Sequence, residues 1–188
     1  MTPIEIAAQV ISILGMAMNV LSFQQKNKNT VIFFQFFGGA LFSVSFFMLS
    51  APVGAIMNVI AVIRAVVYMN KEKFRSDSII WVYVFTASFF ISYALTFTLI
   101  GKEPSVKNLI VELLPIIGMI ATTVSFRLEG AREVRRLGLI SAPAWLTYNI
   151  FCFSLGGILC EAFGIISIFI GMIRFDFGKA KRRGHGDT

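Results

Sequence analysis

Amide and aromatic side chains stand inside stretches of the chain that are otherwise apolar. The four that could contact a solute are Asn58, Trp145, Tyr148 and Asn149. In a helix, Trp145 and Asn149 share one face and Tyr148 lies beside them, because residues three and four positions apart are neighbours. A stacking surface combined with amide donors and acceptors suits a neutral polar solute. The alternative is that these groups join helices, since such hydrogen bonds between membrane helices contribute about 0.6–2 kcal/mol each.

Two carboxylates also lie within apolar sequence. Glu161 is about four residues inside the outer end of its apolar stretch, and Glu112 is placed similarly in another stretch. Removal from water disfavours the charged form of a carboxylate, so such a group can take up and release a proton during transport. Glu161 is the candidate for proton coupling. The alternative for both residues is a carboxylate that reaches the outer headgroup region.

Polar side chains also gather where the first apolar stretch ends. The candidates for a cytoplasmic gate are Asn19, Ser22, Gln24 and Gln25. For Asn19 and Ser22, packing between helices is the competing interpretation.

Two arginines occupy matching positions near the inner ends of apolar stretches. Arg64 and Arg174 are both predicted to extend to the cytoplasmic interface, because a long cationic side chain can bury its stem and keep its charge in water. A gating ion pair is the alternative.

Other classes of function find no support in the sequence. The one histidine, His185, lies in a polar tail, so no metal site, no cofactor and no histidine-activated nucleophile is expected. The protein is therefore not expected to be an enzyme. Cys152 and Cys160 lie in apolar sequence, where free cysteines pack as small hydrophobic residues.

Seven apolar stretches must position these side chains. They are 5–23, 29–50, 53–70, 79–100, 108–126, 137–155 and 158–175. Each has about the 17–25 residues that an α-helix needs to cross a hydrocarbon layer of about 30 Å. Charged residues make up only 14% of the chain, compared with about 25% in soluble domains. The pattern predicts an all-α integral membrane protein with seven transmembrane helices.

The positive residues fall almost entirely on one side of such a membrane. Lys102 and Lys107 lie on one side, and the other 15 of the 17 lysines and arginines lie on the opposite side. Because lysine and arginine concentrate in cytoplasmic connections, the N-terminus is predicted outside and the C-terminus in the cytoplasm. The net charge of +7 is interpreted as anchoring to anionic lipids rather than as binding to nucleic acid.

The chain also contains an internal repeat. Gly-Met at 15–16 and Ser-Phe at 22–23 recur 103 residues later, whereas Gly54 and the Ile-Arg pair at 63–64 recur 110 residues later. The seven additional residues fit a longer connection from Arg127 to Arg136 in the second copy. Duplication of three helices around an unmatched fourth predicts a 3-1-3 arrangement of two parallel triple-helix bundles.

The repeat sets the expected division of the chain. The first bundle covers 1–71, linker helix four covers 72–104, the second bundle covers 105–176, and a basic cytoplasmic tail covers 177–188. Two bundles in one chain make a monomer sufficient for a pathway, and a homo-oligomer is left open.

This plan and two short motifs resemble the SWEET and PQ-loop carriers. Ser22-Phe23-Gln24-Gln25 stands where those carriers have a Pro-Gln pair, and 54–59 resembles the stretch whose asparagine faces substrate. Over nearly its whole length, the chain resembles the YgjV family of bacterial inner-membrane proteins. The resemblance implies an inner-membrane location and contact between Asn58 and a solute. Ile168 stands at the repeat position of Asn58, which disfavours a sugar as that solute.

We therefore expect a SWEET-like carrier or facilitator that moves a small polar solute by alternating access. Its expected partners are membrane lipids and that solute. The alternative is a non-transporting inner-membrane protein that acts as an assembly partner or a lipid-interacting factor.

Overall fold

The fold is a bundle of long helices, seen in a computed structural model that describes residues 2–48, 52–99, 101–151 and 155–177. No strand occurs in these residues. The helices are α1 (Pro3–Ser22), α2 (Lys28–Met48), α3 (Pro52–Met69), the short α4 (Lys71–Phe74), α5 (Ile80–Thr98), α6 (Val106–Arg127), α7 (Ala131–Phe151) and α8 (Leu155–Met172). A π-helical turn, η1 (Ile173–Phe177), extends α8.

Local sequence signals set the start of α1. The Thr2 hydroxyl accepts a hydrogen bond from the Glu5 amide (3.2 Å), and the Glu5 carboxylate accepts one from the Thr2 amide (2.9 Å). Pro3 occupies the first turn, where its missing N–H costs nothing. This reciprocal cap satisfies backbone donors that a helix start otherwise leaves unpaired.

Several helices are suited to crossing a membrane. Within the described residues, α1, α2, α5, α6 and the segment Gly157–Asp176 are long and apolar enough by length and composition. The apolar segment Gly54–Met69 of α3 is shorter, and α7 begins with a charged turn. The prediction of an all-α membrane protein is therefore confirmed at this level.

One helix boundary differs from the sequence prediction. The prediction starts the sixth apolar stretch at 137 and places Arg127 to Arg136 in a long connection, but α7 begins at Ala131 and the connection from α6 spans only 128–130. Hydropathy marks where apolar sequence stops rather than where a helix stops. Glu133 in the first turn also favours the helix, because its negative charge lies at the positive end of the helix dipole.

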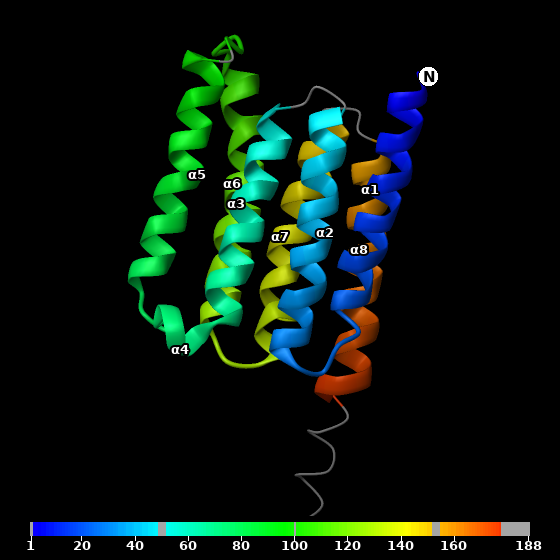
Figure 1. Cartoon of the computed structure of the whole chain (residues 1–188), viewed down its shortest axis with the longest axis vertical. Helices are drawn as coiled ribbons and strands as arrows, with labels where there is room; N and C mark the ends of the chain where they lie inside the picture. Colours follow the sequence, from blue (N-terminus) through cyan, green and yellow to red (C-terminus); the bar gives the residue numbers. More distant parts are fainter. Residues whose placement is uncertain (1, 49–51, 100, 152–154, 178–188) are drawn as a thin grey trace, which may run out of the picture.

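The long helices pack in a simple pattern (Figure 1). Helix α2 packs against both α1 and α3, and α7 packs against both α6 and α8. Between these groups, α1 contacts α8, α2 contacts α7, and α3 contacts α6. Helix α5 packs against α6 and α3 at the edge of the bundle.

Positive charge gathers at one end of the bundle, which we call the basic end. There α1, α3 and α6 finish, and α2, α5 and α7 begin, as Figure 1 shows at the bottom of the view. Its described lysines and arginines are Lys26, Lys28, Lys71, Lys73, Arg75, Arg127, Arg132, Arg135, Arg136 and Arg174. Lys102 and Lys107 lie near the other end, in the connection from α5 to α6 and at the start of α6.

Aromatic side chains fill the buried core between α3, α5 and α6. The Tyr68 ring lies 5.9 Å from the Phe126 ring and 6.2 Å from the Phe85 ring, and Phe89 is fully buried nearby. Large apolar side chains on the outer faces, such as Ile6 of α1, are exposed. Such a surface is suited to contact with lipid rather than water.

Close approach of α1 and α2 depends on glycine. A Cβ atom added at Gly38 would overlap the Asn19 carboxamide and lie 3.2 Å from the Gly15 carbonyl oxygen. At the neighbouring Gly39, an added Cβ atom would come no closer than 3.4 Å to Val62. Small residues allow membrane helices to approach closely, and here only one of two adjacent glycines is needed for that purpose.

We therefore expect Gly38→Ala to lower the melting temperature of the purified protein, because α1 and α2 must separate. Gly39→Ala is the matched control and should leave the melting temperature unchanged or raise it, since alanine favours a helix by up to about 1 kcal/mol over glycine. Tryptophan fluorescence during heating in detergent measures both. Equal melting temperatures for the two variants would contradict this account of the α1–α2 contact.

Candidate functional site

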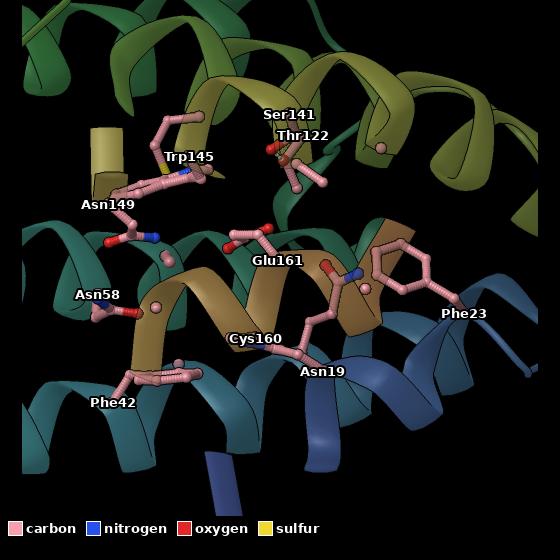
Figure 2. A pocket seen from close by; sticks show the side chains of 18 of the residues that line it. Asn19, Phe23, Phe42, Asn58, Thr122, Ser141, Trp145, Asn149, Cys160 and Glu161 are labelled. Carbon is pink, nitrogen blue, oxygen red and sulfur yellow. Dashed lines mark hydrogen bonds between the residues drawn. The ribbon is translucent and has the colours of Figure 1, made fainter. Parts of the chain in front are cut away.

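A cavity of about 170 Å³ lies between the helices (Figure 2). Residues of α1, α2, α3, α6, α7 and α8 line it, together with Phe23 just after α1. The lining residues are Asn19, Phe23, Gln35, Gly39, Phe42, Phe46, Asn58, Ala61, Arg64, Met119, Thr122, Val134, Gly138, Ser141, Ala142, Trp145, Asn149, Gly157, Cys160, Glu161 and Gly164. None of the described residues of α5 lines it.

Three of the four predicted solute contacts line this cavity: Asn58, Trp145 and Asn149. The Asn58 amide nitrogen donates to the Gly54 carbonyl oxygen (2.8 Å), so the amide is held against its own helix. Figure 2 shows Asn149 and Asn58 near one another and Trp145 beside Asn149. Residues far apart in the sequence thus form one amide and aromatic wall.

Glycines on neighbouring helices make room for two of these side chains. The Trp145 indole rests on Gly118 of α6, where an added Cβ atom would lie 2.7 Å from the ring. The Asn149 carboxamide occupies the corresponding space at Gly157 of α8. Both side chains are therefore fixed by packing rather than free to turn away from the cavity.

Tyr148 is the predicted contact that does not line the cavity. Its ring packs edge-on against the Trp145 ring, with 5.8 Å between the ring centres. Tyr148 therefore packs against Trp145 and helps to fix the orientation of its ring.

Glu161 lies among the lining residues. In Figure 2 its carboxylate lies between Trp145 and Asn149 on one side and Asn19 on the other. Within the described residues, no hydrogen bond or ion pair of this carboxylate is seen. Glu112 differs, because its buried carboxylate pairs with the Lys102 ammonium group away from the cavity.

The four gate candidates fall in two places. Asn19 lines the cavity, and Ser22 is buried behind it, where its hydroxyl donates to the Asn19 carbonyl oxygen (2.6 Å). The Ser22 hydroxyl also accepts from the Gln35 amide (3.2 Å). Gln24 and Gln25 lie beyond the end of α1, at the basic end of the bundle.

These two glutamines meet the other half of the bundle. The Gln24 amide donates to the Ser167 carbonyl oxygen (2.7 Å) and hydroxyl (2.9 Å), and that hydroxyl donates to the Val20 carbonyl oxygen (2.6 Å). The Gln25 carbonyl oxygen accepts a hydrogen bond from the Arg135 guanidinium (2.9 Å). The loop after α1 is thus tied to both α7 and α8.

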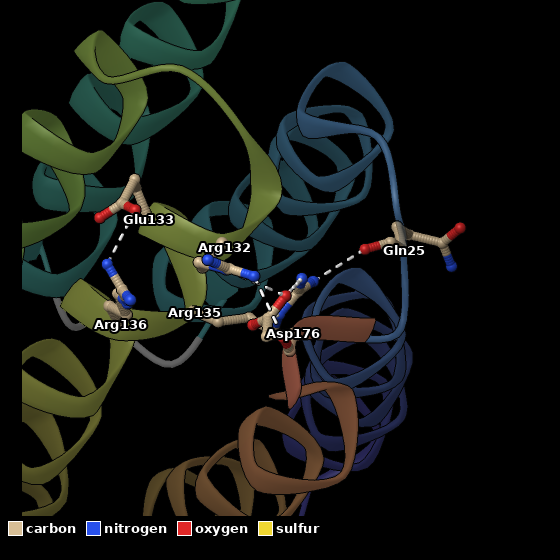
Figure 3. A network of polar contacts seen from close by, with 6 residues as sticks. All are labelled: Gln25, Arg132, Glu133, Arg135, Arg136 and Asp176. Atoms are coloured by element: carbon tan, nitrogen blue, oxygen red, sulfur yellow. Dashed lines mark hydrogen bonds and ion pairs between the residues drawn. The ribbon is translucent and has the colours of Figure 1, made fainter. Parts of the chain in front are cut away.

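A buried ion pair holds Arg135 in this position (Figure 3). Its Nε and Nη2 atoms donate to the two carboxylate oxygens of Asp176, at 2.9 and 2.6 Å. Both side chains are more than nine-tenths buried, and Arg132 donates to the Asp176 carbonyl oxygen (3.0 Å). We call Gln24, Gln25, Arg135, Ser167 and Asp176 the latch. Asp176 lies in the π-helical turn, a feature that often marks functional positions.

Arg64 corrects a sequence prediction. The residue does not extend to the interface: its side chain is only 4% exposed and lines the cavity. Its Nη1 atom donates to the Met119 carbonyl oxygen and the Thr123 hydroxyl, both at 3.0 Å, and its guanidinium lies 4.9 Å from the Phe126 ring centre. The prediction is wrong because residue 64 faces α6 rather than lipid. Arg174, by contrast, is exposed.

Sequence reasoning also missed smaller features of the site. The Thr122 hydroxyl donates to the Ser141 hydroxyl (3.1 Å) across α6 and α7, and both line the cavity. Cys160, which the sequence predicts to pack as a free cysteine, is a buried free thiol, and its place in the cavity wall was not predicted. No group of potential metal ligands is found in the described part of the chain. Cys152, His185 and the tail from 178 onward lie outside the described residues.

Comparison with known proteins gives one match. The model of a protein family, Imp-YgjV, described as a bacterial inner membrane protein, matches residues 6–179. No curated protein and no solved structure matches the chain. Similarity to the SWEET carriers therefore stays a prediction.

Proposed function

This chain belongs to the Imp-YgjV family of bacterial inner membrane proteins, and we propose that it carries a small polar solute across that membrane. The mechanism is alternating access, in which two helix groups rock around a fixed site between them. The chain has no part in catalysis under this proposal. The observation that carries it is the cavity lined by polar groups from six helices.

The proposed architecture is the 3-1-3 arrangement, with all seven long helices crossing the membrane. The packing of α1, α2 and α3 in one group and α6, α7 and α8 in another supports it. Helix α5 contributes no described residue to the cavity wall, as expected of a linker helix that orients the second group. Each group supplies three of the lining helices, so relative motion of the groups would reshape the cavity.

The basic end is assigned to the cytoplasm. Its lysines and arginines outnumber the two at the opposite end, Lys102 and Lys107, and such a bias marks cytoplasmic connections. The N-terminus would then lie outside and the C-terminus inside. Anionic lipid headgroups would be the partners of this end.

The latch provides the means of closing the cytoplasmic side. Arg135 and Ser167 belong to the second group, and their partners, Gln25 and Gln24, follow α1 of the first group. Asp176 holds the Arg135 guanidinium by two charge-assisted hydrogen bonds, which are stronger than neutral ones. Opening toward the cytoplasm would require these contacts to break.

Cavity size limits the solute. An engineered cavity of about 150 Å³ in another protein holds benzene, so this cavity of about 170 Å³ fits a solute of about six to ten non-hydrogen atoms. A disaccharide is too large for the cavity in this state. Trp145 and Phe42 supply flat apolar surface, while Asn58 and Asn149 supply amide groups.

Binding of a solute tests the proposal directly. A compound present at 100 times its dissociation constant should stabilise the purified protein by about 2.7 kcal/mol, provided that it binds only the folded state. Asn58→Ala should abolish the stabilisation, because it removes an amide of the cavity wall, while the variant itself stays folded. A thermal-stability screen in detergent against small metabolites measures both.

The matched control is Asn70→Ala, which removes an exposed asparagine that also donates to a carbonyl oxygen four residues earlier (2.8 Å). Stabilisation should persist in this control. If no small metabolite stabilises the wild-type protein, the carrier proposal fails and a non-transporting assembly or lipid-interacting role takes its place.

The latch makes a separate prediction. Asp176→Asn should speed the reaction of Cys160 with a membrane-impermeant thiol reagent about tenfold or more from the cytoplasmic side, because a broken buried ion pair destabilises the closed end by several kcal/mol. Inverted membrane vesicles that carry a Cys152→Ser background give the measurement. Glu133→Gln is the control, since it breaks only the more exposed Arg136 pair within α7. Equal reaction rates in the two variants would count against the latch.

A further inference from the structure

Arg64 is a buried cation without a counter-ion in the described part of the chain. Its Nη1 atom bonds two neutral acceptors, the Met119 carbonyl oxygen and the Thr123 hydroxyl. Its Nε atom is buried and has no hydrogen-bond partner. No carboxylate lies within ion-pair distance of the guanidinium among the described residues.

Burial of the Arg64 charge without an anionic partner costs free energy. An arginine five residues from the end of a membrane helix can usually place its charge in the interfacial water. Arg174 at the matching repeat position is exposed, whereas Arg64 is buried. A charge that is removed from water and bonded only to neutral groups is left uncompensated, which destabilises the empty state.

The cavity gives Arg64 access to a ligand. Arg64 lines it together with Asn58 and Ala61 of the same helix, so Arg64 belongs to the same wall as the predicted solute contact Asn58. The one acidic residue in the lining, Glu161, forms no ion pair with it. An anion that enters the cavity would therefore find a preformed cationic group that no side chain has already neutralised.

Resting on the proposed function, we propose that the solute is a small organic anion whose carboxylate binds the Arg64 guanidinium. Planar guanidinium and carboxylate groups match one another through parallel hydrogen bonds, which favours arginine for this role. Trp145 and Phe42 would contact the organic part, and the amides of Asn58 and Asn149 would bind its polar substituents. The size limit of about six to ten non-hydrogen atoms corresponds to a short-chain or single-ring carboxylic acid.

Glu161 provides a second test of the charge of the solute. It lines the same cavity, so its charged form repels a bound anion and its neutral form does not. Removal of this acid should therefore strengthen anion binding, whereas removal of Arg64 should weaken it. For a cationic solute, removal of Glu161 should weaken binding and removal of Arg64 should strengthen it. For a zwitterion, both changes should weaken binding.

The experiment compares matched acids and amides on the full-length protein in detergent. Lactate and lactamide, and benzoate and benzamide, differ in charge but little in shape; sodium chloride at equal ionic strength is the salt control. Isothermal titration calorimetry gives the dissociation constants. We expect the acids to bind at least about tenfold more tightly than their amides, because one charge-assisted contact of about 1.4 kcal/mol corresponds to that factor.

The substitutions test the direction in which each charged residue affects acid binding. Arg64→Gln should weaken acid binding about thirtyfold or more, since loss of one partner of a buried charge pair costs more than 2 kcal/mol. Glu161→Gln should strengthen it. Arg174→Gln removes an exposed arginine, keeps the same net charge as Arg64→Gln, and should leave binding unchanged. If Arg64→Gln does not fold, Arg64→Lys keeps the charge and should weaken binding less, because lysine lacks the planar donor pair.

The outcomes separate this inference from the proposed function. Amides that bind as tightly as acids, with loss in Asn58→Ala but not in Arg64→Gln, would overturn the anion assignment and leave the carrier standing. Weaker acid binding in Glu161→Gln would also overturn it. A response to chloride equal to the response to the acids would mean an adventitious anion effect, and failure of every compound to bind would remove both proposals.

Discussion

A polar group within the hydrocarbon of a membrane has no water to bond, and this constraint organises the whole molecule. Most polar side chains of the helices meet it by bonding to carbonyl oxygens. The Ser45 hydroxyl donates to Ala8 of α1 (2.9 Å), and the Ser43 hydroxyl donates to Ala55 of α3 (3.3 Å). Asn58, Arg64 and Glu161 are different, because these three residues line the cavity. Two buried side-chain atoms of the described residues lack a hydrogen-bond partner, the Arg64 Nε atom and the Tyr68 hydroxyl, and of these two residues only Arg64 lines the cavity.

This distribution separates structural polar groups from those available to a ligand. Buried hydroxyls fix α1 and α3 against α2, and the Arg135–Asp176 pair fixes the basic end, with its charges fully used. Arg64 has the opposite character, since its charge is buried against neutral acceptors and a ring. Under the proposed function, three features would together allow the protein to bind and release an anion: the cavity between two helix groups, the end closed by a few polar contacts, and the buried Arg64 cation.

Much of the fold followed from the sequence because hydrocarbon thickness and hydropathy determine helix length. Every long helix lies within a few residues of an apolar stretch, except that α7 begins earlier, where charged residues continue the helix. The environment of Arg64 could not be predicted, because a helix that is apolar all round does not reveal which face meets lipid. The Arg135–Asp176 pair was missed for a related reason: charges next to apolar stretches were assigned to membrane anchoring. Asn58, Trp145 and Asn149 were selected from the sequence because burying an amide or indole N–H without a hydrogen-bond partner costs free energy. The structure places all three residues at the cavity.

The central claim is that a solute crosses the membrane through this cavity. Exchange of a labelled short-chain carboxylate, such as lactate, across proteoliposomes loaded with the same unlabelled compound tests it most directly. The account predicts exchange that saturates with concentration and falls to the protein-free rate in the Asn58→Ala protein. Exchange in wild-type proteoliposomes no faster than in protein-free liposomes, for every small solute that binds, would contradict it.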